Sequence, residues 1–217
     1  MDQERVRRCG AVPDGAGVAW RVWAPRAKAV ELVLIDGDKR RGVRMEPEDF
    51  GFYRTAAREV PEGQRYAYRL DGGEDRPDPC SLWQPEGVFG PSAVVRPDRF
   101  AWSDSAWRGV RREDLVFYEL HVGTFTREGT FEAIIPRLQS LRDLGITAIE
   151  LMPVGQFSGT RNWGYDGVLP YATQHSYGGP RSLQDSCRPA APSASQCAVP
   201  LVPRATMSAL GGSDQEW

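Results

Sequence analysis

The stretches LVFYELHV, residues 115–122, and ITAIELMPV, residues 146–154, decide the fold of this sequence. Each is a nearly continuous apolar run, which is typical of a strand that is buried on both faces. Between them PRLQSLRDLG, residues 136–145, has Pro136 placed for a first helical turn and Gly145 placed just past the C-cap. A strand, a turn region, a helix and a second strand in this order predict a parallel β/α arrangement.

The residues before about 100 show a different pattern, in which short strand-like runs are separated by turn signals. VAWRVWAP, AVELVLID, GFYRTAA and QRYAYRL are the clearest runs, and the last places Tyr66 and Tyr68 on one face. This spacing, without a helical period, predicts a small antiparallel β-sandwich over residues 1–100. Most of its aromatic side chains are expected in the core, with sugar contact as the alternative for an exposed one such as Trp23.

Two further segments stand out by composition. Residues 71–109 are rich in Pro, Gly, Asp and Trp, which predicts an ordered but irregular connection. Residues 181–217 are dominated by Ser, Ala, Pro and Arg and show no regular period, which predicts an irregular C-terminal tail. The expected organisation is therefore a sandwich over 1–100, a β/α region over 101–180 and a tail over 181–217.

The overall composition excludes several classes of function. The chain has 217 residues, 41% hydrophobic and 26% charged, with a net charge of −2, so it has no basic footprint for nucleic acid. No apolar run is long enough to span a membrane, and MDQERVRRCG at the start lacks the apolar region of a signal peptide. Two histidines and four scattered cysteines suggest no metal site and no cofactor. The cysteines favour free thiols in a reducing cytoplasm.

Five motifs that follow one another along residues 18–180 resemble the α-amylase superfamily, glycoside hydrolase family thirteen. They read VWAPRAKAVELVL, DPCSLWQPEGVFGPS, VFYELHVGTFTREGTF, LRDLGITAIELMPV and RNWGYDGVLPYA. The set is most similar to the members that release trehalose from maltooligosyl trehalose, and branching and debranching enzymes share its layout. The resemblance implies an immunoglobulin-like β-sandwich followed by the first β/α units of a truncated (β/α)8 barrel. It also implies a retaining glycosidase that cuts the α-1,4 bond next to the trehalose unit.

The loop RNWGYDG is the candidate substrate-binding site. The resemblance matches Tyr165 to a tyrosine that stacks under the sugar at the cleavage subsite, and it places Asp166 to bind sugar hydroxyls. Trp163 either walls that subsite or packs the loop. The alternative for the whole loop is a packed turn at the top of the barrel that meets no ligand.

No catalytic residue is assigned to this chain. The resemblance puts the nucleophile, the general acid and the second aspartate on later strands, and the Asp-Val-Val-Tyr-Asn-His block that should follow YGGP is missing. Glu119 and Glu150 are expected to be structural, and Asp143 is expected to be a solvated helix residue. The change of composition at Arg181 suggests a shifted reading frame, which translation of the other two frames of the coding DNA would test.

Three functions therefore compete. The chain is expected to be an N-terminal fragment of a trehalose-releasing glycosidase, inactive by itself, whose partner is an α-glucan or maltooligosyl trehalose. The alternatives are a non-catalytic α-glucan-binding module and a fragment without function. The sequence does not set the oligomeric state.

Overall fold

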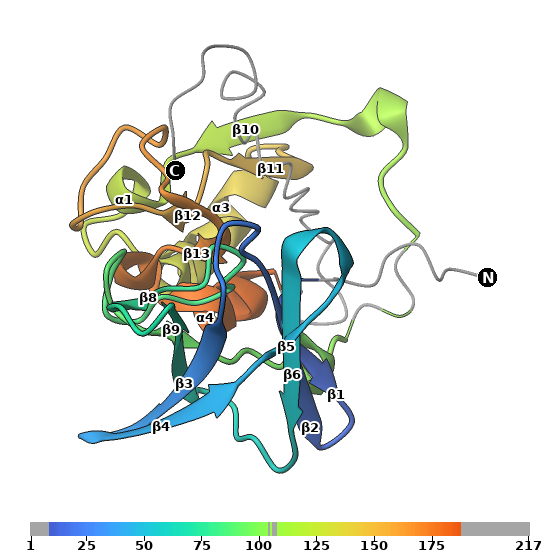
Figure 1. Ribbon diagram of the computed structural model, residues 1–217. Helices are drawn as coiled ribbons and strands as arrows, with labels where there is room; N and C mark the ends of the chain where they lie inside the picture. The colour runs from blue at the N-terminus through green and yellow to red at the C-terminus, as the bar shows by residue number, and fades with distance from the viewer. Residues whose placement is uncertain (1–8, 104, 106–107, 188–217) are drawn as a thin grey trace.

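The computed structural model describes residues 9–103, 105 and 108–187 of the chain. Figure 1 shows a β-sandwich in the lower part of the view and a smaller region of helices and short strands above it. Both belong to the described part of the chain, and the irregular segment after the last sandwich strand links one to the other.

The sandwich consists of two antiparallel sheets. The first has the strand order β1-β2-β6-β5, from β1 (Gly10–Asp14), β2 (Gly17–Trp23), β6 (Phe52–Ala57) and β5 (Glu46–Pro47). The second has the order β4-β3-β7-β8 with β9 beside β7, from β4 (Lys39–Arg44), β3 (Val30–Asp36), β7 (Arg65–Leu70), β8 (Asp75–Arg76) and β9 (Ser92–Ala93). The predicted antiparallel sandwich is confirmed.

Alternating side chains of both sheets meet in one core. Trp20, Tyr66 and Tyr68 are almost completely buried in it. Tyr66 lies edge-on between the other two rings, with centroid distances of 5.9 Å to Trp20 and 6.0 Å to Tyr68. The prediction that the two tyrosines share a face is confirmed, because residues two apart on a strand point to the same side.

Strand β4 shows where the sequence pattern was misleading. The stretch DGDKR, residues 36–40, reads as a turn in the sequence, but only Gly37 and Asp38 form the turn, and Lys39 and Arg40 already pair with β3. The strand is a charged, exposed edge and has no apolar alternation to reveal it. Lysine and arginine on an edge strand oppose pairing with another chain. Charged edge strands of this kind therefore lack the apolar alternation by which a strand is recognised in a sequence.

The irregular segment after β7 is ordered, as predicted, and Arg96 ties it to the sandwich. This side chain is only 2% exposed. Its guanidinium donates hydrogen bonds of 3.0 Å to the carbonyls of Gly15, Ala16, Gly17 and Val60. One buried cation thereby satisfies four backbone acceptors in two different turns.

Short 3-10 helices lie at Asp49–Gly51 (η2), Pro97–Arg99 (η3) and Arg112–Asp114 (η4).

Two parallel strands, β10 (Phe117–Leu120) and β11 (Ala148–Leu151), form the centre of the upper region. The helices α1 (Val122–Phe125), α2 (Phe131–Ile134), η5 (Ile135–Arg137) and α3 (Leu138–Asp143) connect them. The order and the parallel pairing agree with the predicted strand–helix–strand unit. Gly145 follows the C-cap residue of α3 with a φ of +99°, as its position in the sequence predicted.

Strand β10 differs from its prediction in burial. Val116 and Phe117 are 49% and 53% exposed, so this strand is not buried on both faces. Its inner face, with Leu120, does join the buried cluster under the helices. In the described part of the chain β11 is its one strand neighbour, which leaves the opposite face and edge of β10 uncovered.

The predicted turn region between β10 and α3 contains the helices α1 and α2. Thr130 is the N-cap of α2, and its hydroxyl accepts a 3.3 Å hydrogen bond from the amide of Ala133. Each helix is a single turn of four residues, which is too short to give a recognisable apolar period. Tertiary packing of Phe131 and Ile134 into the buried cluster stabilises the second of them.

The described chain ends with β12 (Gly155–Gln156), β13 (Leu169–Thr173), η6 (His175–Tyr177) and α4 (Gly179–Ser186). Helix α4 crosses the boundary predicted at residue 181, so the irregular tail was placed too early. Leu183 packs against the buried cluster and explains why the first residues after the boundary are helical. Residues 188–217, which make up most of the predicted tail, lie outside the described residues.

Trp83 forms the seam between the sandwich and the upper region. It pairs with Thr173 of β13, and the neighbouring carbonyl of Leu82 accepts a 3.1 Å hydrogen bond from the Thr173 amide. A Cβ atom on Gly179 at the start of α4 would lie only 3.0 Å from the indole nitrogen of Trp83. The guanidinium of Arg181 lies 4.8 Å from the ring centre of Phe100. The predicted irregular connection is therefore a packed joint.

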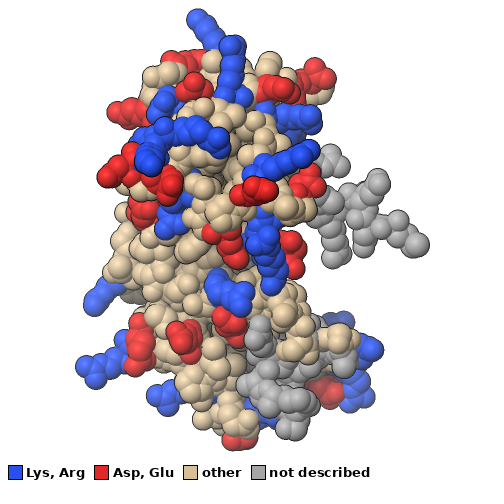
Figure 2. Space-filling model, turned by 90° about the horizontal axis from the view of Figure 1, so that it is seen from below, with Lys and Arg blue, Asp and Glu red and all other residues tan. Residues whose placement is uncertain are grey.

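Figure 2 shows acidic and basic side chains interspersed on one face of the molecule, without a large area of one sign. No helix in the described ranges is long and apolar enough to cross a membrane. Among the same residues no group of three or more potential ligands is arranged to hold a metal ion.

Candidate sugar-binding site

The candidate site is the loop over residues 157–168, which connects β12 to β13. The two strands are antiparallel, and the amide of Val168 donates a 2.8 Å hydrogen bond to the carbonyl of Gln156. The loop therefore leaves and returns at neighbouring points, just after the carboxyl end of β11. In parallel β/α folds this end of the strands is where ligands meet the protein.

A rigid base holds both ends of this loop. Gln156 and Gln174 are completely buried. The amide of Phe157 donates a 2.9 Å hydrogen bond to Oε1 of Gln174, and Nε2 of Gln174 donates a 3.0 Å hydrogen bond to the carbonyl of Gly159. Gln156 accepts a 3.0 Å hydrogen bond from the amide of His175. Nothing in the sequence pattern had marked either glutamine.

Gly164 brings the middle of the loop close to the strand ends. Its φ is +92°, which a glycine adopts without strain, and its amide donates a hydrogen bond to Oδ1 of Asn162. A Cβ atom here would lie 3.1 Å from Cε of Met152 and 3.7 Å from Cδ2 of His121. The glycine therefore lets the backbone lie directly on these two side chains.

The structure places all three predicted site residues on the outer part of this loop. Trp163 is 86% exposed, Tyr165 is 63% exposed and Asp166 is also exposed. Within the described chain no hydrogen bond or ring contact is recorded for the two aromatic side chains. Both rings therefore face solvent in the described structure.

An aromatic cluster lies under the loop, and it escaped the sequence reasoning. Tyr177 is its centre, with ring centroids 5.9 Å from Phe131, 5.6 Å from Phe157 and 6.1 Å from His121. The hydroxyl of Tyr177 lies 3.4 Å from Nε2 of His121. Nδ1 of His121 is buried and has no hydrogen-bond partner among the described residues. His121 had looked isolated in the sequence because Tyr177, which its ring contacts, lies 56 residues further along the chain in η6.

Burial raises the pKa of the Tyr177 hydroxyl above 10.0, against the opposing effect of a hydrogen bond from the amide of Gly123. A raised pKa means that the folded state keeps a proton that the unfolded state loses near pH 10, so stability falls as the pH rises above that value. We expect the free energy of unfolding to fall more steeply between pH 9.5 and 11 in the native chain than in Tyr177→Phe. Urea unfolding at each pH measures this, and parallel curves would contradict it. Tyr171→Phe, at a 64% exposed position, is the control that should follow the native chain.

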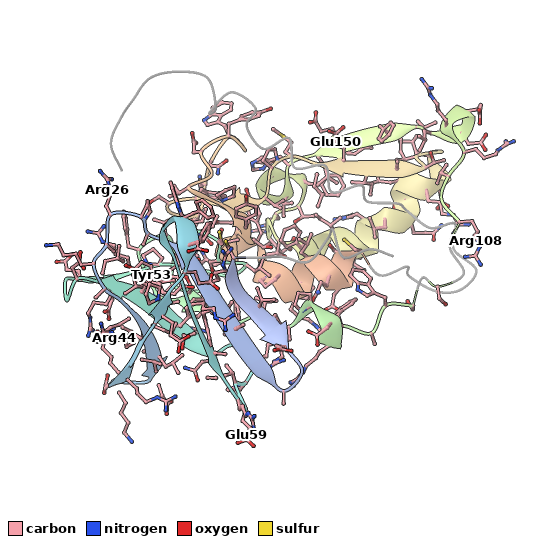
Figure 3. The ribbon with its side chains drawn as sticks, turned by 45° about the vertical axis from the view of Figure 1, so that its right-hand side comes forward. Arg26, Arg44, Tyr53, Glu59, Arg108 and Glu150 are labelled. Carbon is pink, nitrogen blue, oxygen red and sulfur yellow. The ribbon has the colours of Figure 1, made fainter. Side chains whose placement is uncertain are left out.

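The acidic residues of the two parallel strands lie side by side. Glu119 pairs in register with Glu150, so both carboxylates belong to the face of the sheet opposite the buried cluster. Glu119 is exposed and Glu150 is half-buried, and Figure 3 labels Glu150 at this sheet, far from the sandwich. Neighbouring like charges are unfavourable, and nothing in this arrangement positions them on a substrate. Neither is given a catalytic role.

The sandwich is similar to a class of protein domain, the carbohydrate-binding modules. Residues 8–83 match the family described as carbohydrate-binding module 48 (isoamylase N-terminal domain). The predicted resemblance to a particular group of enzymes is confirmed as well. The chain is 50% identical over 172 residues to malto-oligosyltrehalose trehalohydrolase of Saccharolobus solfataricus, which covers 79% of this chain and 30% of that relative.

Further comparisons agree. Malto-oligosyltrehalose trehalohydrolase of Deinococcus radiodurans is 42% identical over 178 residues, covering 81% of this chain and 29% of its own length. A 1,4-alpha-glucan branching enzyme of Vibrio parahaemolyticus is 32% identical over 199 residues, covering 81% of this chain and 26% of the relative. The chain thus spans less than a third of the length of these curated relatives.

Solved structures share the fold. A putative α-amylase from Salmonella typhimurium superposes with a TM-score of 0.74 at 39% identity, covering 83% of this chain and 32% of that one. Pullulanase type I from Bacillus subtilis, solved with maltose, has a TM-score of 0.70 at 22% identity, covering 84% of this chain and 31% of its own. At that identity the second comparison supports the fold alone.

Proposed function

We propose that this chain supplies the N-terminal, substrate-holding part of a trehalose-releasing α-glycosidase of the malto-oligosyltrehalose trehalohydrolase type. The similarity to those enzymes over most of the chain supports the proposal. The single observation that carries it is the exposed aromatic loop held on a rigid base after β11. Its partner would be maltooligosyl trehalose or another α-glucan.

The chemistry of the loop suits a glucose ring. Each ring has an apolar face and a polar rim of hydroxyl groups. The face packs on Tyr165, whose own ring is 63% exposed, and a carboxylate such as Asp166 accepts hydrogen bonds from the rim. Trp163 is 86% exposed and can form the wall of the same subsite.

The two parallel strands fit the start of a (β/α)8 barrel in this proposal. In a closed barrel, neighbouring strands would pair with both edges of β10, and the barrel interior would cover the face that bears Phe117, which is 53% exposed here. Glu119 and Glu150 would then point toward the barrel interior. The uncovered strand edge would also make this region prone to aggregation by itself.

The chain would bind its substrate without cutting it. A retaining glycosidase needs two carboxyl groups about 5–5.5 Å apart across the bond to be broken. The resemblance places those groups on strands whose motifs are missing from this sequence. We also propose a cytoplasmic location, because a reducing environment suits the free thiols of Cys9 and Cys187.

A second candidate function, a non-catalytic α-glucan-binding module, has its own support in the match of residues 8–83. In that case the sandwich would hold the glucan and the loop would contribute little. The first candidate predicts that a change in the loop weakens glucan binding, and the second predicts that the affinity stays nearly the same.

Tyr165→Ala is expected to weaken binding of maltooligosyl trehalose by about tenfold, because one aromatic stacking contact contributes about 1–1.5 kcal/mol. Tyr165→Phe should retain most of the affinity, since the apolar ring remains. Isothermal titration of each variant measures the effect. Tyr171→Ala is a matched control, because that tyrosine is 64% exposed on β13 and lies outside the loop. Equal affinities for all three variants and the native chain would refute the role of the loop.

A further inference from the structure

His121 lies where the candidate loop rests on the two parallel strands. It directly follows β10, which ends at Leu120, and it precedes α1. In parallel β/α folds ligands meet the protein at this end of the strands. The proposed sugar contacts use the exposed rings of the loop, and they leave this half-buried imidazole without a role.

Three consecutive atoms of the imidazole ring each meet a neighbour. Cε1 lies 3.0 Å from the position that a Cβ atom on Gly123 would occupy, so the ring lies against that backbone. Nε2 lies 3.4 Å from the hydroxyl of Tyr177. Cδ2 lies 3.7 Å from the Cβ position of Gly164, in the middle of the loop. The ring therefore fills the space between α1 and the backbone of the loop.

Tyr177 orients this ring. Its oxygen accepts a hydrogen bond from the amide of Gly123, which leaves its own proton for Nε2 of His121. A neutral imidazole that accepts at Nε2 carries its proton on Nδ1. Tyr177 is itself only 2% exposed and packs edge-on against Phe131 and Phe157. The imidazole thus takes its orientation from a buried side chain that is packed on several sides.

Nδ1 of His121 shows that this orientation has a cost in stability. The atom is buried and has no hydrogen-bond partner among the described residues. A buried polar group without a partner destabilises the folded state. A leucine in this place would fill the same space without that cost, so packing alone does not explain a histidine here.

The second side chain under the loop differs in character. Cε of Met152 lies 3.1 Å from the Cβ position of Gly164. A methionine side chain is flexible and adapts to the shape around it, so it fills space without fixing the backbone that it touches. The imidazole is planar, rotates about fewer bonds and is held at Nε2. Of these two supports, His121 is therefore the one that can set a defined position for Gly164.

We propose that His121 is a positioning residue of the candidate loop. Its ring holds Gly164 in place, and Gly164 lies directly between Trp163 and Tyr165 in the chain. The imidazole thereby sets the direction in which both rings face a sugar, although it does not itself touch the sugar. The consequence for binding rests on the proposed function of the loop, whereas the effect on the loop itself does not.

Hydrogen exchange of the full chain, followed by mass spectrometry, tests the positioning directly. In His121→Leu we expect the amides of residues 157–168 to exchange at least about tenfold faster, and those of β3 and β7 to exchange as in the native chain. Leucine fills the space of the ring but has no group that Tyr177 can hold. His121→Gln should keep slow exchange, because its side-chain amide can reach the position of Nε2. Met152→Leu is the matched control under Gly164, and its exchange should stay within about twofold of the native chain.

Isothermal titration with maltooligosyl trehalose measures the consequence for binding. His121→Leu should weaken the affinity by about five- to tenfold, while its Tm stays within about 2 °C of the native value or rises, because the unpaired Nδ1 is gone. His121→Gln should restore the affinity to within about twofold. In a Tyr165→Ala background the leucine substitution should have little further effect, because the ring that it positions is absent. A residue that only stabilised the fold would lower the Tm and the affinity together.

The outcomes separate the positioning role from the function of the loop. Unchanged exchange over residues 157–168 in His121→Leu overturns the inference, whatever the binding result. Faster exchange across the sandwich as well also overturns it, because the residue would then stabilise the whole fold. Faster exchange confined to the loop supports the inference even if maltooligosyl trehalose does not bind, and that result would refute the proposed function alone.

Discussion

Replacing Arg96 by leucine is expected to lower the free energy of unfolding by at least about 3 kcal/mol. The guanidinium donates to four carbonyls, and each buried acceptor that loses its donor costs about 1–3 kcal/mol. Leucine keeps much of the apolar bulk but supplies no donor. The turn that contains Gly15, Ala16 and Gly17 should therefore separate from the segment after β9. Urea unfolding followed by circular dichroism measures the change.

The control for this variant is Arg99→Leu, three residues further on and exposed. That substitution should change the free energy of unfolding by no more than about 0.5 kcal/mol, as most surface substitutions do. Arg96→Lys should fall between the two, because it keeps a cation but cannot reach four acceptors with one ammonium group. Equal stability of the two leucine variants would show that Arg96 does not join the connection to the sandwich.

Gly179→Ala is expected to destabilise the chain by about 2–4 kcal/mol through two separate effects. The first is backbone strain, because the φ of Gly179 is +70°. The second is a clash, because the new Cβ atom would lie 3.0 Å from Nε1 of Trp83 at the seam. Gly159→Ala separates them, since Gly159 has a φ of +78° and nothing within 4 Å of its Cβ position.

Thermal and urea unfolding of the two alanine variants should therefore differ by about 1–3 kcal/mol, which is the part due to Trp83. The double variant Trp83→Phe, Gly179→Ala should recover some of that difference, because the ring that clashes is smaller. If Gly159→Ala lowers the free energy of unfolding as much as Gly179→Ala does, the contact with Trp83 does not hold α4 against the sandwich.

Most of the sandwich could be predicted because apolar and polar residues alternate along its core strands. Tyr66 and Tyr68 show the pattern clearly, since they occupy alternate positions of β7 and both rings are buried in the sandwich core. Edge strands such as β4 could not be predicted, because their exposure on both faces removes the alternation on which the prediction depends. The burial of Phe117 was predicted wrongly for a related reason, since the sequence reports how apolar a strand is and not which neighbours cover it.

The position of the candidate loop could be predicted from its motif, but its support could not. Tyr165 and Trp163 are close in sequence, so one loop was enough to place both. Tyr177 and His121 are 56 residues apart and meet only through the fold. Helix α4 was missed because its first turns lie at a change of composition, where a periodic signal of eight residues is weak.

The account depends on a chain that holds an α-glucan without cutting it. Titration of maltooligosyl trehalose into the purified chain, followed by chromatography of the same sample for free trehalose, tests this most directly. We predict saturable binding and no trehalose. Release of trehalose by this polypeptide would contradict the account, because cleavage requires a carboxylate pair that we assign to strands outside it.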